Sequence, residues 1–377
     1  MKSYTVTATD LESFKEQLNK STYSKVNFAI IFAGVNHNFE ELVTFMNTQK
    51  IEFAGCSSAG EIYNGAYLNN SIVAILMETE AGDYYQANTI IETGKEHAIA
   101  CALSEKINSN INNADLMMFS SGIANDHNAL IQGLRSIFGD SILLHGAIAG
   151  DSMTFQQTFV FDNEGVKNSG MILIGFDKQK IEIASHAVTG WKGIGKSCVI
   201  TKSKGNIVYE IDNKPALDVF VNYFDIENFD KLKEEEIWSI PGQHPLEIVV
   251  DDETKYLRSI MIMNREDRSL VLAGTVEEGA QFRFCNTPSI TEVDTTIEKY
   301  SDIANKHDDF DFSIMVSCAG RGAAFGPILE DEIEGIHKIW NKPMVGMLAY
   351  GEIGCVENQS YDFHNLTCSL ITFKAIA

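Results

Sequence analysis

A pattern of strand, turn, helix and strand that ends in a glycine-rich turn and an acidic residue occurs three times in this 377-residue sequence. The first copy has the apolar run VNFAIIFA at 26–33, a helical pattern after Gly34, and the turn GCSSAGEI at 55–62. The second copy, at 115–151, ends in GAIAGD, and the third, at 311–353, ends in GMLAYGEI. Such self-similarity indicates an architecture built from one repeated structural unit.

Each copy continues with a variable connection, an asparagine and another apolar strand. The asparagines are Asn70, Asn168 and Asn365, and the strands that follow are SIVAILM, SGMILIGF and LTCSLITF. A helix between two strands is the usual crossover between parallel neighbours. We therefore expect a mixed α/β fold of three repeated strand–helix–strand–strand units. Mixed sheets covered by helices should form two domains, residues 1–212 and 213–377.

The region between the second and third copies has a different pattern. Residues 181–212 predict strands separated by glycine-rich turns, and residues 214–236 predict a helix with an acidic end. Residues 246–285 predict further strands, and 291–306 predict another helix. The change of pattern near 205–215 is the reason for placing the domain boundary there.

The composition excludes several classes of partner. The net charge of −23 disfavours nucleic acid and anionic membranes as partners, because both require basic surface patches. No apolar run approaches the roughly 20 residues that cross a bilayer. Residues 1–10 lack the apolar core of a signal peptide, so we expect a cytoplasmic protein. The seven cysteines include no CxxC pair, which predicts reduced thiols, no metal site and no cofactor.

One motif suggests a nucleotide site but lacks the required context. Residues 190–197, GWKGIGKS, match the P-loop pattern GxxxxGK[ST]. That pattern binds phosphate only where a helix follows the glycine-rich turn. The β-branched residues after Ser197 predict a strand instead. We interpret the motif as a tight turn in which Trp191 packs against its neighbours.

Several segments together resemble the FIST family of sensory modules. The segments at 55–62, 146–151 and 190–220 resemble the N-terminal FIST domain. SCAGRGAAFG at 317–326, GMLAYGEIGC at 346–355 and FHNLT at 363–367 resemble the C-terminal FIST domain. The resemblance implies a sensor that binds a small ligand such as an amino acid. It leaves no room in the chain for an output domain, so we expect a standalone sensor or a signalling partner that acts in trans.

Four charged residues are candidates for binding an amino-acid-like ligand. Arg321 lies in a predicted glycine-rich turn and offers a guanidinium group that matches a carboxylate. Glu61, Asp151 and Glu352 end the three glycine-rich turns and could bind an ammonium group. We expect the three acids to approach one cavity that Arg321 also reaches, with a hydrogen bond or one water molecule between Arg321 and an acid. The alternative is structural: the acids accept backbone N–H bonds, and Arg321 forms a salt bridge with one of them.

Neutral and aromatic side chains complete the candidate ligand-binding set. Hydroxyl and amide groups near the glycine turns could add hydrogen bonds, and a histidine beside Asn365 could be either a ligand or a core residue. These further candidates are Ser57, Ser58, Ser121, Asn125, Trp191 and His364.

An enzyme is the alternative function, namely a cysteine- or carboxylate-dependent hydrolase or transferase that acts on a small substrate. Cys56 or Cys318 could be the nucleophile, with His145, His186 or His364 as the base. The sequence does not pair a particular cysteine with a particular histidine. Small buried thiols are the commoner interpretation of such cysteines, so we favour a sensor over an enzyme.

Overall fold

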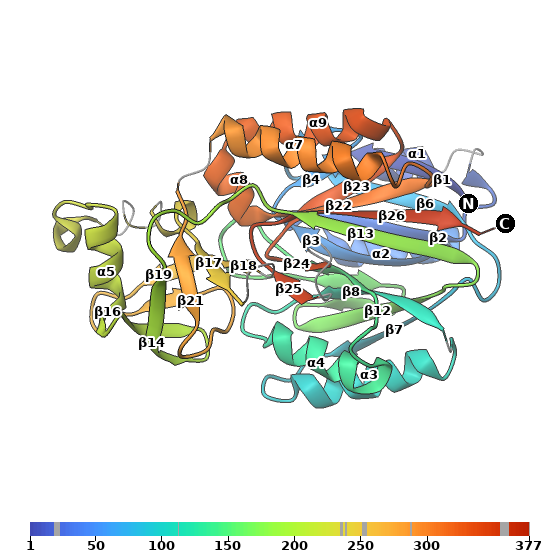
Figure 1. Cartoon of the computed structure of the whole chain (residues 1–377). Coiled ribbons are helices and arrows are strands. Elements are labelled where there is room, and N and C mark those ends of the chain that lie inside the picture. Colours follow the sequence, from blue (N-terminus) through green and yellow to red (C-terminus); the bar gives the residue numbers. More distant parts are fainter. Residues whose placement is uncertain are drawn as a thin grey trace.

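The computed structural model describes residues 1–18, 23–111, 113–233, 237, 240–250, 255–286, 289–354 and 362–376. The chain forms a larger lobe, which carries both termini, and a smaller lobe (Figure 1). The larger lobe contains three six-stranded sheets, and the smaller lobe contains an eight-stranded sheet. The predicted mixed α/β class is therefore confirmed. In the part of the chain that the structure describes, no helix is long and apolar enough to cross a membrane.

The first repeated unit sets the pattern of the larger lobe. Strand β2 runs parallel to β3, and β6 runs antiparallel to β2 and to β1, which gives the order β1-β6-β2-β3. Helix α2 begins after Asn38, whose side chain accepts a hydrogen bond from the Glu41 N–H as an N-cap. The elements are β1 (Lys2–Ala8), α1 (Leu11–Leu18), β2 (Phe28–Gly34), α2 (Phe39–Gln49), β3 (Glu52–Ser58), β4 (Glu61–Tyr63), β5 (Ala66–Leu68) and β6 (Ile72–Glu78).

The second unit has the same order of elements and the same pairing. Its strand order is β7-β12-β8-β9, with β8 parallel to β9 and β12 antiparallel to β8. The elements are β7 (Tyr84–Ile90), α3 (Glu96–Asn108), β8 (Ala114–Ser120), α4 (His127–Phe138), β9 (Leu144–Ile148), β10 (Val160–Asp162), β11 (Gly165–Lys167) and β12 (Gly170–Asp177).

The third unit repeats the arrangement with one additional helix. Its strand order is β13-β26-β22-β23, with β22 parallel to β23. The elements are β13 (Ile181–Val188), α7 (Ile290–Ala304), β22 (Phe312–Cys318), α8 (Ala319–Phe325), α9 (Ile328–Trp340), β23 (Met344–Ala349), β24 (Gly351–Gly354), β25 (Asp362–His364) and β26 (Cys368–Ala375). Helix α8 occupies the segment that the sequence predicts as a glycine-rich turn. That prediction was wrong because packing against the core outweighs the low helix propensity of glycine.

Each unit gives its short hairpin to the sheet of another unit. Hairpin β4–β5 pairs with β23, hairpin β10–β11 pairs with β3, and hairpin β24–β25 pairs with β9. The first unit thus completes the third, the second completes the first, and the third completes the second. This closed cycle of exchanged hairpins holds the three sheets together.

The central strands have apolar side chains on both faces, and each face contributes to a different part of the core. In β2, Phe32 belongs to the central cluster with Phe119 and Ile314 of the other two units, whereas Ile31 packs beneath α1 and α2. Helices cover the outside of the sheets, and the inner faces meet each other (Figure 1). The central strands β2, β8 and β22 are therefore buried on both faces, as long apolar strands require. Burial of each phenylalanine side chain stabilises the lobe by about 2–3 kcal/mol.

The smaller lobe lies between β13 and α7 in the sequence. Its helix α5 (Ala216–Tyr223) is shorter than the predicted helix at 214–236, because Asp225 and Asn228 adopt positive φ angles that end it. Residues 234–236 lie outside the described residues. The other elements are β14 (Cys198–Lys204), β15 (Ile207–Ile211), β16 (Lys214–Pro215), η2 (Phe229–Lys231), η3 (Pro241–Gln243), β17 (Leu246–Val249), β18 (Lys255–Arg258), β19 (Ile260–Met263), β20 (Leu270–Leu272) and β21 (Gln281–Phe284).

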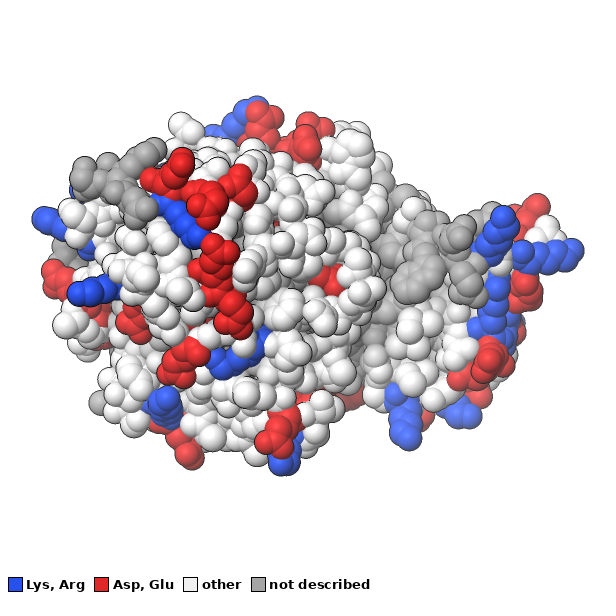
Figure 2. All heavy atoms as spheres, turned by 180° about the vertical axis from the view of Figure 1, so that it is seen from behind, with Lys and Arg blue, Asp and Glu red and all other residues white. Residues whose placement is uncertain are grey.

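The structure bears on the P-loop-like segment and on the distribution of surface charge. Strand β14 directly follows the P-loop-like segment, which confirms that no helix begins there. Figure 2 shows a band of acidic side chains across the larger lobe and a mixture of basic and acidic side chains on the smaller lobe. The absence of a nucleic-acid partner stays a prediction.

Candidate functional site

A cavity of about 490 Å³ lies between the two lobes. The larger lobe contributes residues 122–126, which connect β8 to α4, the first two residues of α4, and Ile148 at the end of β9. The smaller lobe contributes Asn206, Met261 and residues 271–275. The carboxyl ends of neighbouring parallel strands are where open α/β sheets bind ligands. The parallel pair β8 and β9 therefore places this cavity where a binding site is expected.

A second cavity, of about 130 Å³, continues the first toward the third unit. Both cavities are lined by Phe155, Met261, Ala273 and Tyr350. The second is also lined by residues 318–320, where β22 ends and α8 begins. We call the two cavities together the interlobe cleft.

An aromatic wall separates this cleft from the centre of the larger lobe. The rings of Phe155 and Tyr350 stack with their centroids 4.5 Å apart. The Tyr350 hydroxyl donates to the Asp151 carboxylate, which also accepts backbone N–H bonds from residues 154–157. Burial alone would raise the pKa of Asp151, but these hydrogen bonds outweigh it and lower the pKa to about 2. Asp151 thus holds the wall of the cleft in place and stays ionised.

The three glycine-acid turns meet at one point of the larger lobe. A Cβ atom on Gly150 would lie 2.9 Å from the Ala59 nitrogen and 3.2 Å from the Leu348 oxygen, so this contact requires glycine. Three backbone hydrogen bonds link the turns in a ring. They run from Ala59 N to Leu348 O at 2.9 Å, from Gly150 N to Ser57 O at 2.9 Å, and from Tyr350 N to Ile148 O at 3.1 Å.

Glu61 and Glu352 bind within their own units instead of facing the cleft. The Glu61 carboxylate accepts hydrogen bonds from the Ser58 hydroxyl and, at 2.7 Å, from the Ser71 N–H. The Glu352 carboxylate accepts from the Thr367 N–H at 3.1 Å and from its hydroxyl at 2.9 Å. Burial raises the pKa of Glu61 to about 7 and that of Glu352 to about 8. The structural alternative, acids that accept backbone N–H bonds, describes both residues.

Arg321 is completely buried in α8, and its carboxylate partner is Glu332 of α9. Its Nε donates to Glu332 Oε2 at 3.2 Å, Nη2 donates to Oε1, and Nη1 donates to the Leu366 carbonyl at 3.0 Å. The rings of Trp191 and Phe325 flank the guanidinium group. Arg321 forms its ion pair with Glu332 and not directly with one of the three turn acids, because α8 and α9 pack together. The guanidinium group still acts on Glu352 through space and favours its ionised form.

Glu332 could have been found from its position on the helix. It lies among Leu329, Ile333 and Ile336, which form the buried face of α9. A charged residue on an apolar helix face predicts a buried partner. The aromatic residues Phe155 and Tyr350 carried no comparable signal, because a stacking partner from a distant loop has no local pattern.

Asn125 is the predicted site residue that lines the interlobe cleft. Its Nδ2 donates to the Ser121 carbonyl at 2.7 Å and to the Ser169 hydroxyl at 3.1 Å. The Ser121 hydroxyl in turn donates to the Lys167 carbonyl and accepts from the Gly170 N–H, both at 3.0 Å. These bonds fix the loop that leads into α4.

The other predicted residues hold the interior together. The Ser57 hydroxyl donates to the Gly150 carbonyl at 2.7 Å and accepts from the Phe159 N–H at 2.9 Å. A ring nitrogen of the buried His364 lies 3.1 Å from the Gly354 carbonyl, as the core interpretation expects.

The cysteines considered as nucleophiles are poorly suited to that role. Burial raises the thiol pKa of both Cys56 and Cys318 far above neutrality. A thiol with a raised pKa is unionised at pH 7 and is a weak nucleophile. Cys56 contacts the sulfur of Met347 at 3.4 Å. Across the described ranges, no group of three or more His, Cys, Asp or Glu side chains could hold a metal ion.

Comparison with known protein families gives two matches. A model described as the FIST N domain matches residues 27–214, and a model described as the FIST C domain matches residues 216–355. No curated protein matches the sequence at a significant level. The two matches together cover residues of both lobes and of both walls of the interlobe cleft.

Proposed function

Since this chain belongs to the FIST family and contains both its N and C domains, we propose that it is a sensor that binds a small ligand in the interlobe cleft. FIST domains are associated with sensory signal transduction and small-ligand binding. The observation that carries the proposal is the 490 Å³ cavity at the ends of β8 and β9, with walls from both lobes. Its volume lies in the range of small-molecule sites.

The chemistry of the walls favours an amphipathic ligand, such as an amino acid or a related metabolite. Asn125, Asp126 and Asn128 form a polar side, and Met261 and Val271 form an apolar side. The Asp126 carboxylate, which caps α4 through the Ala129 N–H, would accept an ammonium group. The Asn128 amide would donate to a carboxylate, whereas both N–H groups of Asn125 are already used by Ser121 and Ser169. Arg321 is not part of the proposed binding site, because Glu332 already neutralises its charge.

A ligand in contact with both lobes provides a mechanism for signalling. Binding would favour the lobe arrangement in which both walls touch the ligand, since a ligand shifts an equilibrium toward the state that it binds better. We propose that a signalling partner in trans recognises this arrangement of the lobes.

We also propose residues 1–212 and 213–377 as the two sequence domains, although strands from both build the third unit.

The proposal can be tested by filling the cleft. Ala273 is partly exposed and lines both cavities, so Ala273→Phe should occupy ligand space with little effect on stability. Mass spectrometry of small molecules that copurify with the native protein would identify the ligand class. Calorimetry with that class, or with a panel of amino acids, should show at least about a tenfold loss of affinity in the variant.

The matched control is Ala81→Phe, which places the same side chain at an exposed turn away from the cleft. It should bind ligand as the parent protein does. Equal affinity of Ala273→Phe and the parent protein would place the ligand elsewhere and overturn the proposal.

A further inference from the structure

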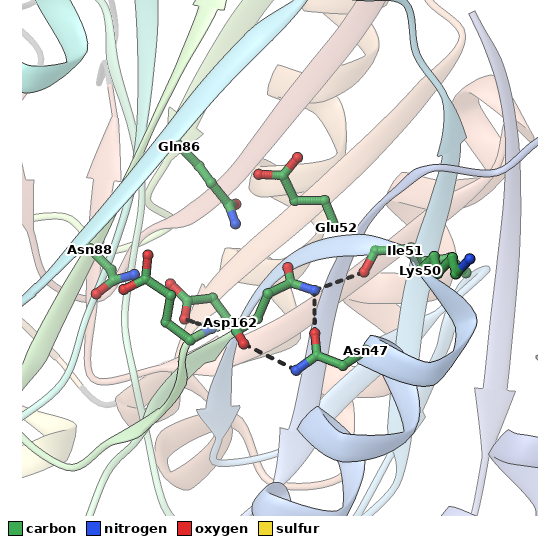
Figure 3. Close-up of a pocket in the computed structure, with 9 residues that line it drawn as sticks. Asn47, Lys50, Ile51, Glu52, Gln86, Asn88 and Asp162 are labelled. Carbon is green, nitrogen blue, oxygen red and sulfur yellow. Dashed lines mark hydrogen bonds between the residues drawn. The ribbon is translucent and has the colours of Figure 1, made fainter.

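A second, polar pocket of about 360 Å³ lies at the junction of the first and second units (Figure 3). Its walls come from the end of α2 and the start of β3 in the first unit, and from β7 and the β10–β11 hairpin in the second. Its lining residues are different from those of the interlobe cleft. We call it the junction pocket and define it by Glu52, Gln86, Asn88, Asp162 and Glu164.

A buried carboxylate oxygen in this pocket has no hydrogen bond of normal geometry from a described residue. The Asp162 side chain is 1% exposed, and its Oδ1 accepts from the Glu164 N–H at 2.9 Å and lies 3.6 Å from Lys167 Nζ. The Asn88 side chain also interacts with the carboxylate as a donor, but no described residue forms a hydrogen bond of normal geometry to Oδ2. Buried oxygens are nearly always hydrogen-bonded, because an unmade bond costs about 1–3 kcal/mol. Oδ2 therefore points to a donor that binds from the pocket.

Gln86 supplies a second acceptor without a partner. Its Nε2 donates to the Phe53 carbonyl at 3.2 Å, which fixes the orientation of the amide and leaves Oε1 buried, with no hydrogen bond from any described residue. Glu52 lines the same pocket, and one of its oxygens accepts from the Tyr84 hydroxyl at 2.7 Å. The groups left available in the pocket are thus mainly acceptors, and the three carboxylates outnumber the two nearby lysines, Lys50 and Lys167. A ligand that complements them must supply several N–H donors and a positive charge.

The repeated architecture shows that the fold itself does not require an acid at this position. Asp162 follows Phe161, which lies opposite Gly55 in the exchanged hairpin of the second unit. The residues at the matching position of the other two exchanged hairpins are Gly354 and Tyr63. Glycine, tyrosine and aspartate therefore all occur at this position, so the exchange of hairpins does not require an acid. The contacts of Asp162 with Glu164 and Lys167 account for Oδ1 but not for Oδ2.

We propose that the junction pocket binds an organic ammonium group, as found in alkyl amines and diamines, through Asp162 and Gln86. A primary ammonium has three donors, which match Asp162 Oδ2, Gln86 Oε1 and a carboxylate oxygen of Glu52 or Glu164. The pocket is larger than a single metal ion fills, and no set of three acidic, histidine or cysteine ligands could hold a metal in the described residues. Lys50, at the rim, extends away from Asp162 in Figure 3 and leaves the acceptors free.

This site is independent of the interlobe cleft and of its proposed ligand. The net charge of −23 raises the local concentration of cations around the protein, which favours capture of an amine. Burial raises the pKa of Asp162, and a bound ammonium group would favour the ionised carboxylate. Amine binding should therefore strengthen as the pH rises from 4 toward 7.

The test is calorimetry on the full chain at pH 7.5 with two amines and their neutral counterparts. Butylamine and 1,4-diaminobutane should bind, and 1-butanol and 1,4-butanediol should not. Asp162→Asn keeps the Oδ1 acceptor for the Glu164 N–H but removes the charge, so affinity for amines should fall at least about tenfold. Gln86→Met removes the second acceptor from a partly exposed residue and should weaken binding even if Asp162→Asn folds poorly.

Two controls separate this site from general effects. Asp115→Asn removes another buried aspartate, one with a lysine partner at 3.0 Å outside the pocket, and should bind amines normally. Ala273→Phe should also bind amines normally, which separates the junction pocket from the interlobe cleft. Equal binding of alcohols and amines, unchanged affinity in both pocket variants, or displacement of the amines by submillimolar Mg²⁺ or Ca²⁺ would overturn the proposal.

Discussion

Replacement of Glu352 by glutamine should change how the stability of this protein depends on pH. The Glu352 carboxyl group is fully buried, and one of its oxygens accepts two hydrogen bonds from Thr367. No described residue forms a hydrogen bond of normal geometry to the other oxygen. Glutamine has almost the same shape and keeps an acceptor for Thr367. Its amide takes the place of the protonated oxygen, so the variant resembles the neutral form of the acid at every pH.

The size of the effect follows from the pKa. Burial raises the pKa of Glu352 from an ordinary value of 4.5 to about 8 in the folded protein. Between these values the folded chain holds a proton that the unfolded chain has released, so the free energy of unfolding falls as the pH rises. At 1.36 kcal/mol per pKa unit, a shift of about 3.5 units corresponds to a loss of about 5 kcal/mol across this window. Glu352→Gln removes that loss.

The measurement is urea unfolding of both proteins from pH 4 to pH 8.5. The two free energies of unfolding should be similar near pH 4, and the variant should be more stable by several kcal/mol at pH 8.5. Glu334→Gln, at an exposed position paired with Lys338, should differ from the parent by less than about 0.5 kcal/mol at each pH. A difference between Glu352→Gln and the parent that stays constant with pH would refute the reasoning.

Two further substitutions test features of the core. Glu332→Gln leaves the buried charge of Arg321 without its partner and should lower the free energy of unfolding by about 3–5 kcal/mol in urea, so a neutral result would contradict the ion pair. Gly346→Ala would place a Cβ atom 2.1 Å from the Met315 carbonyl oxygen between two paired strands, and should lower the melting temperature strongly. Gly242→Ala has no atom within 4 Å of the new Cβ and should melt within about 2 °C of the parent.

The sequence predicted correctly those features of the fold that depend on the pattern of residues within a single helix or strand. The apolar runs predicted the parallel strand pairs, and the helical pattern after Gly34 predicted α2. The exchange of hairpins could not be predicted, because strands of three or four residues contain no information about a partner elsewhere in the chain. Helix α8 was missed for a related reason, since its stability comes from tertiary packing.

The candidate site was predicted only in part. Glycine turns indicated correctly that distant segments meet, and Asn125 does line the cleft. Three of the charged residues predicted to bind the ligand are buried, and Glu61, Glu352 and Arg321 form their hydrogen bonds and ion pair inside the larger lobe. One wall of the cleft comes from the smaller lobe, whose position over β8 and β9 depends on long-range packing that has no local sequence signature.

The cycle of exchanged hairpins also constrains how the chain reaches its native state during synthesis. Hairpin β4–β5 is made early, but its partner strand β23 emerges from the ribosome only after the smaller lobe is complete. Until then hairpin β4–β5 has an unpaired edge, and such edges are prone to pair with other chains. The edge of strand β9 likewise stays unpaired until β24 has been synthesised. A nascent chain that pauses after residue 212 therefore has two unsatisfied sheet edges, and a chaperone that shields them would act at this stage.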